Sequence, residues 1–458
     1  MEIKHLKNII IVSLGFVLNF TAYGGLQTLQ SSLNPEKGIG VASLSVIYGS
    51  LIISSLFLPT IIIKKIGCKW TIAASMCCYI TYSVGNFKPN WYSLMITSTI
   101  LGFGGGPLWA AKCTYLTTSG INYAERTGKE KIDVVNHYFG IFFLIHETSG
   151  VWGNLISSLV LQQSPKKDTF GNETYSHCGA NNCPVSYESF NNSNSSSASS
   201  GVPDNVRYTL MGIYTGCGVL AVIIIAAFLD QIELKEEQNN EVDMKTYVWR
   251  ALLATFKQLK DIRQCLLIPL TIFVGFQQGF LSSDYTKAYV TCTIGIHFVG
   301  YVMICFGATN SVCSYLFGKL SEYTGRISLF MLAAVISTSS MIALLLWPPN
   351  PGQIAVLFIF PVLWSLSDAI TQTLLNALYG VLFHDHKEAA FSNYRVWQSV
   401  GFVITYAYSN FLCVSVKLYI ILSVMILGMI LYLVVEFLEC KKKALPEPEN
   451  IEVTNTNE

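Results

Sequence analysis

Ionisable side chains lie inside several long apolar stretches of this 458-residue sequence. A charged group in hydrocarbon is costly, so each such residue is a candidate functional residue. The residues are Lys112, His146, Glu147, Asp368 and Arg395. In that setting they could form ion pairs, transfer protons or contact a polar solute.

The order of the apolar stretches suggests which of these charges combine. Lys112 and Glu147 lie in consecutive stretches, as do Asp368 and Arg395, so we predict one ion pair from each couple. Two interpretations are open for both pairs, a functional site and a structural ion pair. For His146 the alternatives are proton coupling, because histidine titrates near neutral pH, and ordinary packing.

A second set of polar residues lies along one face of the first apolar stretch. These residues are spaced four, four and three positions apart, which places them on one side of a helix: Asn19, Tyr23, Gln27 and Gln30. Comparable places later in the chain are occupied by Gln277, Gln278 and Asp284. The face could line a cavity for a small solute, or its amides could join neighbouring helices by hydrogen bonds.

Motifs for other chemistries are missing from the sequence. The glycines between Gly102 and Gly106 have no preceding strand and no following Gly-Lys-[Ser/Thr], so we interpret them as a helix-packing surface and not as a phosphate loop. We find no metal-ligand spacing and no nucleophile–base arrangement. We therefore expect no metal, no cofactor and no enzymatic activity, and the net charge of +1 argues against nucleic acid as a partner.

The apolar stretches themselves dominate the chain, which is 52% hydrophobic and only 12% charged. Soluble domains have about 25% charged residues, so the composition indicates a membrane protein. A membrane-spanning helix needs about 20 apolar residues. Twelve stretches qualify, which predicts an all-α polytopic membrane protein: 8–29, 41–63, 70–86, 91–117, 137–162, 206–229, 265–284, 293–317, 327–347, 353–378, 390–412 and 417–438.

A charged segment over residues 230–264 divides these twelve spans into two sets of six. We predict an N-terminal half over 1–229, a cytosolic hinge over 230–264, a C-terminal half over 265–438 and a disordered cytosolic tail over 439–458. Similar features recur at an offset of roughly 255–258 residues, such as Trp109 with Trp364 and Gly67 with Gly325. This offset indicates a parallel repeat of two six-helix halves, as in major facilitator transporters.

The distribution of Lys and Arg predicts the orientation. With the N-terminus in the cytosol, and with charges near a span's end counted with the adjoining segment, the inside holds 21 of the 29 Lys and Arg residues and the outside holds 7. This asymmetry favours two cytosolic termini in a multi-pass protein of the cell membrane, with an endolysosomal membrane as the alternative. The loop 164–205 then lies outside and carries three N-glycosylation sequons, at Asn172, Asn191 and Asn194. Cys178 and Cys183 in the same loop predict a short-loop disulfide.

One loop resembles the cytosolic signature of the major facilitator superfamily. It contains Gly318, Glu322, Gly325 and Arg326 in the spacing Gly-x-x-x-acid-x-x-Gly-basic. An acid and a base placed in this way can join neighbouring helices. The N-terminal counterpart, residues 60–67, has no acid, which weakens the expectation of a conventional transport cycle.

The end of the first span resembles the hallmark of one family. Residues 26–34 read Leu-Gln-Thr-Leu-Gln-Ser-Ser-Leu-Asn, and a glycine-rich segment follows at 101–109, ending in Leu-Trp. This pattern is similar to the uncoordinated-93 family, and the chain length and loop are most similar to its A-type branch.

The resemblance implies a major facilitator fold of two six-helix halves in the lipid bilayer. It also implies an accessory or regulatory protein of another membrane protein, either an ion channel such as a potassium channel or a receptor. The alternative is a secondary transporter of a small solute.

Overall fold

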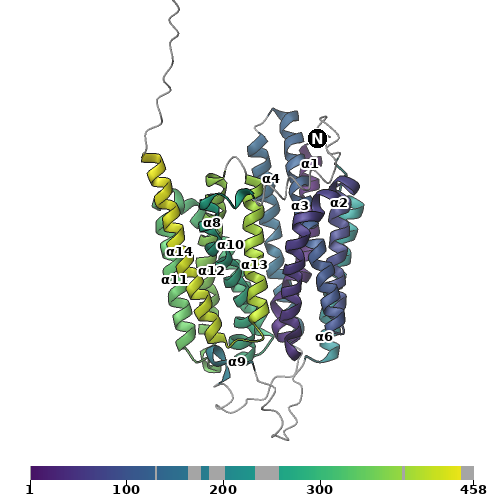
Figure 1. The fold of residues 1–458 in the computed structure, drawn as a ribbon. Helices are drawn as coiled ribbons and strands as arrows, with labels where there is room; N and C mark the ends of the chain where they lie inside the picture. Colours follow the sequence, from purple (N-terminus) through teal and green to yellow (C-terminus); the bar gives the residue numbers. More distant parts are fainter. Residues whose placement is uncertain are drawn as a thin grey trace, which may run out of the picture.

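The computed structural model describes residues 2–128, 131–162, 177–184, 202–232, 257–383 and 387–444, and these residues are predominantly helical. The long helices lie side by side along a common direction (Figure 1). Within the described residues, eight helical stretches are long and apolar enough to cross a membrane. The predicted all-helical membrane class is therefore confirmed.

The helices before residue 230 pack mainly on one another and lie on the right in Figure 1. Helix α2 packs along α3, and α1 packs on α5 and α6. The bounds are α1 Glu2–Leu33, α2 Ile39–Gly85, α3 Trp91–Thr127, α4 Lys131–His146, α5 Thr148–Leu161 and α6 Asp204–Phe228. A short 3-10 turn, η1 Glu36–Gly38, joins α1 to α2.

The helices after residue 257 form a second group on the left. Helix α8 packs on α13 and α14, and α10 packs on α12. The bounds are α8 Ile262–Phe280, η5 Leu281–Thr291, α9 Cys292–Ile294, α10 Phe298–Thr324, α11 Arg326–Leu346, η6 Pro351–Gln353, α12 Ile354–Leu382, α13 Lys387–Tyr408 and α14 Val414–Ala444. The segment η5 is π-helical, a rare conformation that is frequent at functional sites.

The two groups touch mainly along three pairs of elements, α1 with η5, α2 with α13, and α5 with α10, and to a smaller extent between α1 and α10. Each pair joins one element from either side of the charged segment 230–264. These contacts hold the two groups side by side and position the site described below.

Two glycines mark equivalent corners in the two groups. Gly67 interrupts α2 with φ 78° and ψ 166°, and Gly325 precedes α11 with φ 75° and ψ 152°. A side chain at such positive φ values would be strained, so glycine suits both corners. The matching conformations agree with the correspondence predicted for this pair.

Close helix crossings also recur in both groups. A Cβ atom on Gly25 in α1 would collide with the carbonyl oxygen of Gly153 in α5, 2.8 Å away. A Cβ atom on Gly275 in α8 would lie 3.0 Å from Cα of Gly401 in α13. Small residues allow such close approach of membrane helices.

The glycine-rich part of α3 packs against α2. A Cβ atom on Gly106 would lie 2.8 Å from Oγ of Ser54, and one on Gly104 would lie 2.6 Å from Cβ of Cys78. Since Gly102, Gly104 and Gly106 all face this neighbour, the interpretation as a packing surface is confirmed.

Two predicted spans differ from the structure. The span 137–162 is divided into α4 and α5, which meet at Glu147, where the backbone keeps α-helical φ and ψ angles of −63° and −20°. The span 265–284 continues as η5 and α9 to Ile294, so this helix is longer than its apolar pattern indicates. The continuation is buried between helices, and polar residues there are tolerated because they face protein.

The predicted disulfide between Cys178 and Cys183 is wrong. Cys178 bonds to Cys292 at the end of η5, and Cys183 bonds to Cys413 between α13 and α14. Both bonds join the segment 177–184 to the second helix group. We call the end of the bundle that carries these four cysteines the disulfide end; α9 marks it at the bottom of Figure 1.

Candidate functional site

The two helix groups are joined near the disulfide end by side-chain hydrogen bonds, which we call the seam. Oγ of Ser32 lies 2.8 Å from Oγ1 of Thr291, and Oγ of Ser31 lies 3.4 Å from Oγ1 of Thr286. Nδ2 of Asn410 donates to the carbonyl oxygen of Gly38 at 3.0 Å. Every bond links α1 or its following turn to an element of the second group.

Gln27, one turn before Ser31 in α1, also contributes to the seam. Its Nε2 atom donates to the hydroxyl oxygen of Tyr48 at 3.0 Å and to that of Tyr406 at 3.4 Å. Tyr48 in turn stacks on Phe402, with ring centroids 4.4 Å apart. The amide therefore joins α1, α2 and α13, which favours the interpretation of Gln27 as an interhelical hydrogen-bonding residue.

A buried amide network lies next to the seam. Nε2 of Gln30 donates to Oδ1 of Asn86 at 2.9 Å, and Nδ2 of Asn34 donates to Oε1 of Gln30 at 2.9 Å. Arg207 on α6 donates to Oδ1 of Asn34 at 2.7 Å. The conspicuous stretch 26–34 thus fixes the end of α1 both to its own group and to the other group.

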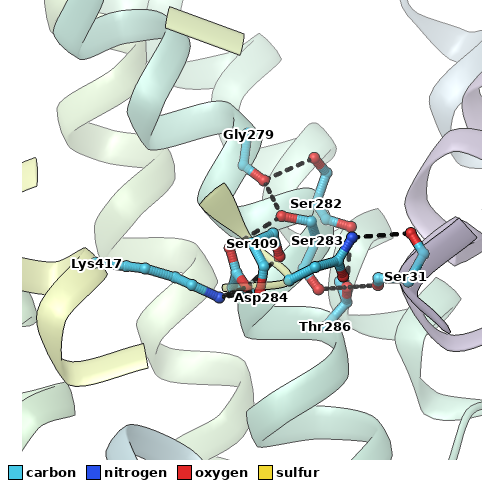
Figure 2. A network of polar contacts seen from close by, with 10 residues as sticks. Ser31, Gly279, Ser282, Ser283, Asp284, Thr286, Ser409 and Lys417 are labelled. Carbon is cyan, nitrogen blue, oxygen red and sulfur yellow. Dashed lines mark hydrogen bonds and ion pairs between the residues drawn. The ribbon is translucent and has the colours of Figure 1, made fainter. Parts of the chain in front are cut away.

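A buried ion pair lies directly behind the seam (Figure 2). Nζ of Lys417 on α14 is 2.7 Å from Oδ1 of Asp284 in η5, and their side chains are only 3% and 4% exposed. Oγ of Ser409 donates to the same oxygen at 2.7 Å, and Ser283 donates to Oδ2 at 3.1 Å. Lys417 also donates to the carbonyl oxygen of Ser409. The pair therefore joins η5 to α14 and to the turn that follows α13.

Sequence reasoning did not predict this ion pair. Lys417 begins the last predicted span and Asp284 ends the seventh, so each was placed at a membrane boundary. Both boundaries lie on the same predicted side of the membrane. Opposite charges at equal depth are the signal that could have identified the pair.

Asp368 does not pair with Arg395, contrary to the prediction. Its Oδ2 atom accepts hydrogen bonds from Asn310 at 2.7 Å and Gln372 at 2.8 Å, and Gln278 donates to both carboxylate oxygens at 3.2 and 3.4 Å. The Asp368 side chain is 0% exposed. Arg395 instead donates to Oε1 of Gln398 at 3.1 Å. Asp368 therefore has three amide partners and, among the described residues, no cationic one.

The predicted ion pair between Lys112 and Glu147 is also not formed. Lys112 is 1% exposed, and its Nζ atom lies 4.5–5.3 Å from the ring centroids of four aromatic residues: Trp109, Phe139, Phe142 and Phe143. Glu147 is exposed at the point where α4 meets α5. His146 is buried in the same aromatic cluster, 5.4 Å from Phe142 between ring centroids.

We expect Lys112→Met to keep the protein folded, with a free energy of unfolding within about 1 kcal/mol of the wild type. Cation–π contacts contribute roughly 0.5–2 kcal/mol, and their loss is offset because no ammonium group is then desolvated. Lys112→Glu should instead prevent folding, since an anion is repelled by ring faces. Thermal unfolding of the two purified variants, compared with wild type, measures both outcomes. Equal damage by both substitutions would contradict this assignment.

The remaining residues of the polar face lie inside the first helix group. Asn19 and Tyr23 line a cavity of about 10 Å³ between α1, α2 and α6, and neither polar side-chain atom of Asn19 has a hydrogen-bond partner there. Such a volume holds one water molecule. Gln277 donates to the carbonyl oxygen of Trp364 at 3.1 Å, joining α8 to α12.

The base of the signature-like loop pairs with an acid on α14. Arg326 lies 2.7 Å from Glu436 on α14, so it joins α11 to α14. Gly318 and Glu322 belong to helix α10 and Gly325 forms the corner after it. The three sequons at Asn172, Asn191 and Asn194 and most of the segment 230–264 lie outside the described residues.

Comparison with protein families gives one match that covers most of the chain. Residues 33–433 match the family model described as "Ion channel regulatory protein UNC-93". The chain is 62% identical to "Protein unc-93 homolog A" of Xenopus laevis, over 95% of this chain and 94% of that protein. The human protein of the same name is 54% identical, over 97% of this chain and 96% of that protein.

A more distant relative is the "Putative potassium channel regulatory protein unc-93" of Caenorhabditis elegans. It is 33% identical, over 94% of this chain and 61% of that protein.

Solved structures with a similar fold are transporters. A bacterial homologue of the human lysosomal transporter Spinster, inward-facing and unoccupied, aligns with a TM-score of 0.64 at 11% identity, over 97% of this chain and 99% of that chain. The nucleoside transporter NupG aligns with a TM-score of 0.63 at 12% identity, over 93% and 98%. At this identity the likeness shows the fold alone.

Proposed function

Because the chain belongs to the UNC-93 family, we propose that it is a regulatory protein of another membrane protein, namely an ion channel of the potassium-selective kind. The carrying observation is the family match over residues 33–433, whose description is that of a channel regulator and not of an enzyme. The name of the nematode relative supports potassium as the channel's ion.

The seam supports this proposal from the side of the structure. Hydrogen bonds of Ser32, Asn410 and Gln27 connect the helix groups at one end, where two disulfides also join the segment 177–184 to the second group. A transporter must open and close both ends in each cycle, whereas a regulator that docks on a partner needs no such cycle.

We further propose that the chain crosses the membrane twelve times as two six-helix halves, 1–229 and 265–438. The segment 230–264 and the tail 439–458 would lie in the cytosol with both termini, and the disulfide end outside. The matching corners at Gly67 and Gly325 and the repeated glycine crossings support two related halves. Glycosylation at Asn172, Asn191 or Asn194 would fit the outside loop, as the four disulfide-bonded cysteines would fit an oxidising compartment.

A secondary transporter of a small solute is the second candidate function. The favouring observation is Asp368, a buried carboxylate without a cationic partner among the described residues. The fold shared with transporters agrees with this candidate without adding evidence for a solute.

Purification from cells that express the tagged chain at native level, in mild detergent, tests the regulatory proposal. We expect a channel subunit in fixed ratio, and a changed potassium current when chain and channel are expressed together. Three exposed residues on different helices, Leu159, Ile223 and Val335, are each replaced by tryptophan in separate variants. We expect the variant whose face contacts the channel to capture less of the channel subunit, and the other two variants to serve as controls. A chain purified alone, with unchanged currents, would count against the proposal.

A further inference from the structure

Three amide side chains from different helices surround the carboxylate of Asp368. Gln278 comes from α8, Asn310 from α10, and Gln372 from the same helix as Asp368, α12. Asn310 is itself oriented by Ser314, whose hydroxyl donates to Oδ1 at 3.1 Å. The cluster thus joins α8, α10 and α12 of the second helix group.

The charge of this cluster is unbalanced. Asp368 is completely buried, and a buried carboxylate costs several kcal/mol unless a cation or a proton compensates it. The other buried carboxylates of this group among the described residues are Asp284, with Lys417 at 2.7 Å, and Glu436, with Arg326 at 2.7 Å. Asp368 has only neutral amides among the described residues, and these stabilise a charge without neutralising it.

The cluster is rich in oxygen atoms that could bind a cation. Each amide has an oxygen as well as the nitrogen that now points to Asp368, and rotation of the amide exchanges the two. At Asn310 the Ser314 hydroxyl, which now donates to Oδ1, would then accept from the amide nitrogen. Among the described residues, Oδ1 of Asp368 accepts one hydrogen bond, from Nε2 of Gln278 at the long distance of 3.4 Å. In α8, Gln277 directly precedes Gln278, and its Oε1 atom is buried without a hydrogen-bond partner.

The carboxylate and the amides of the cluster differ in exposure. The side chains of Gln278, Asn310 and Gln372 are each half-buried, so the partners of Asp368 are less enclosed than the carboxylate itself. This difference matters because any ion site requires an entry path.

We propose that Asp368, with the amide oxygens of Gln278, Asn310 and Gln372, binds a small monovalent alkali cation such as Na⁺. Oxygen ligands without thiolate or imidazole favour hard cations over transition metals. A single carboxylate neutralises a single positive charge, whereas a divalent ion would leave one excess charge buried. The site does not depend on whether the protein regulates a channel.

The test uses the purified full-length protein in detergent, with Na⁺ as the probe. Thermal unfolding is followed while NaCl replaces choline chloride at constant ionic strength. We expect a saturable rise of the unfolding midpoint by several degrees with Na⁺, because a ligand bound only by the folded state stabilises it. Saturable binding of radioactive ²²Na⁺, displaced by excess NaCl, should show one site per chain.

The variant Asp368→Asn should lose both effects. Asp284→Asn is the matched control, because it also removes a buried carboxylate. In the wild type Asp284 is paired with Lys417, so we expect the variant to start from a lower midpoint but to keep the rise with Na⁺. If Asp368→Asn does not fold, Gln372→Leu should raise the Na⁺ concentration for half effect at least tenfold. The proposal is overturned if the wild type shows no Na⁺-dependent rise, if only pH moves its midpoint, or if Asp368→Asn rises equally.

Discussion

Replacement of Lys417 by methionine is expected to lower the free energy of unfolding by about 3–5 kcal/mol. The substitution removes the cation that lies 2.7 Å from Asp284 and leaves that carboxylate buried at 4% exposure. Ser409 and Ser283 can still donate to its oxygens, but two hydroxyl groups do not neutralise a charge. Since Ser409 also loses the partner of its carbonyl oxygen, the contact of α13 with α14 should weaken as well.

Adding Asp284→Asn to Lys417→Met should restore most of the lost stability. The double variant buries no charge, and an asparagine keeps an oxygen that Ser409 can donate to. A double-mutant cycle of thermal unfolding in detergent, with the four proteins measured side by side, gives the coupling energy of the pair. Equal stability of Lys417→Met and the double variant would show that the two side chains are not coupled.

Local patterns predicted the helices well because their cause is local. An apolar stretch of about 20 residues must form a helix in a bilayer, whatever its neighbours are. The π-helical continuation η5 was not predicted, because its polar residues are stabilised by burial against other helices and not by their own sequence.

Pairings between residues could not be predicted, because helix packing and not sequence order decides them. Adjacency in sequence suggested Lys112 with Glu147 and Asp368 with Arg395, and both pairings are wrong. Asp284 and Lys417, which do pair, are 133 residues apart. The sequence shows that the stretch 26–34 is distinctive. That it contributes to the seam follows only from the positions of η5 and α13 beside it.

The two disulfides give the second large effect. Cys178–Cys292 closes a separation of 114 residues and Cys183–Cys413 one of 230. We expect removal of either pair by serine substitution to lower the free energy of unfolding by about 2–4 kcal/mol, chiefly because the unfolded chain becomes less constrained. Thermal unfolding of Cys178→Ser/Cys292→Ser and Cys183→Ser/Cys413→Ser measures this loss, with Cys440→Ser, an exposed free cysteine, as the matched control.

A cleavage experiment decides the connectivity itself. A protease site inserted between residues 185 and 201, outside the described residues, lies after both loop cysteines and before both of their partners. After cleavage, the two fragments should stay linked on a denaturing gel without reductant and separate when reductant is added. Either serine pair alone should leave them linked through the remaining bond, and both pairs together should release them. A bond between Cys178 and Cys183 would hold nothing across the cut, so fragments that separate without reductant would refute the two long-range disulfides.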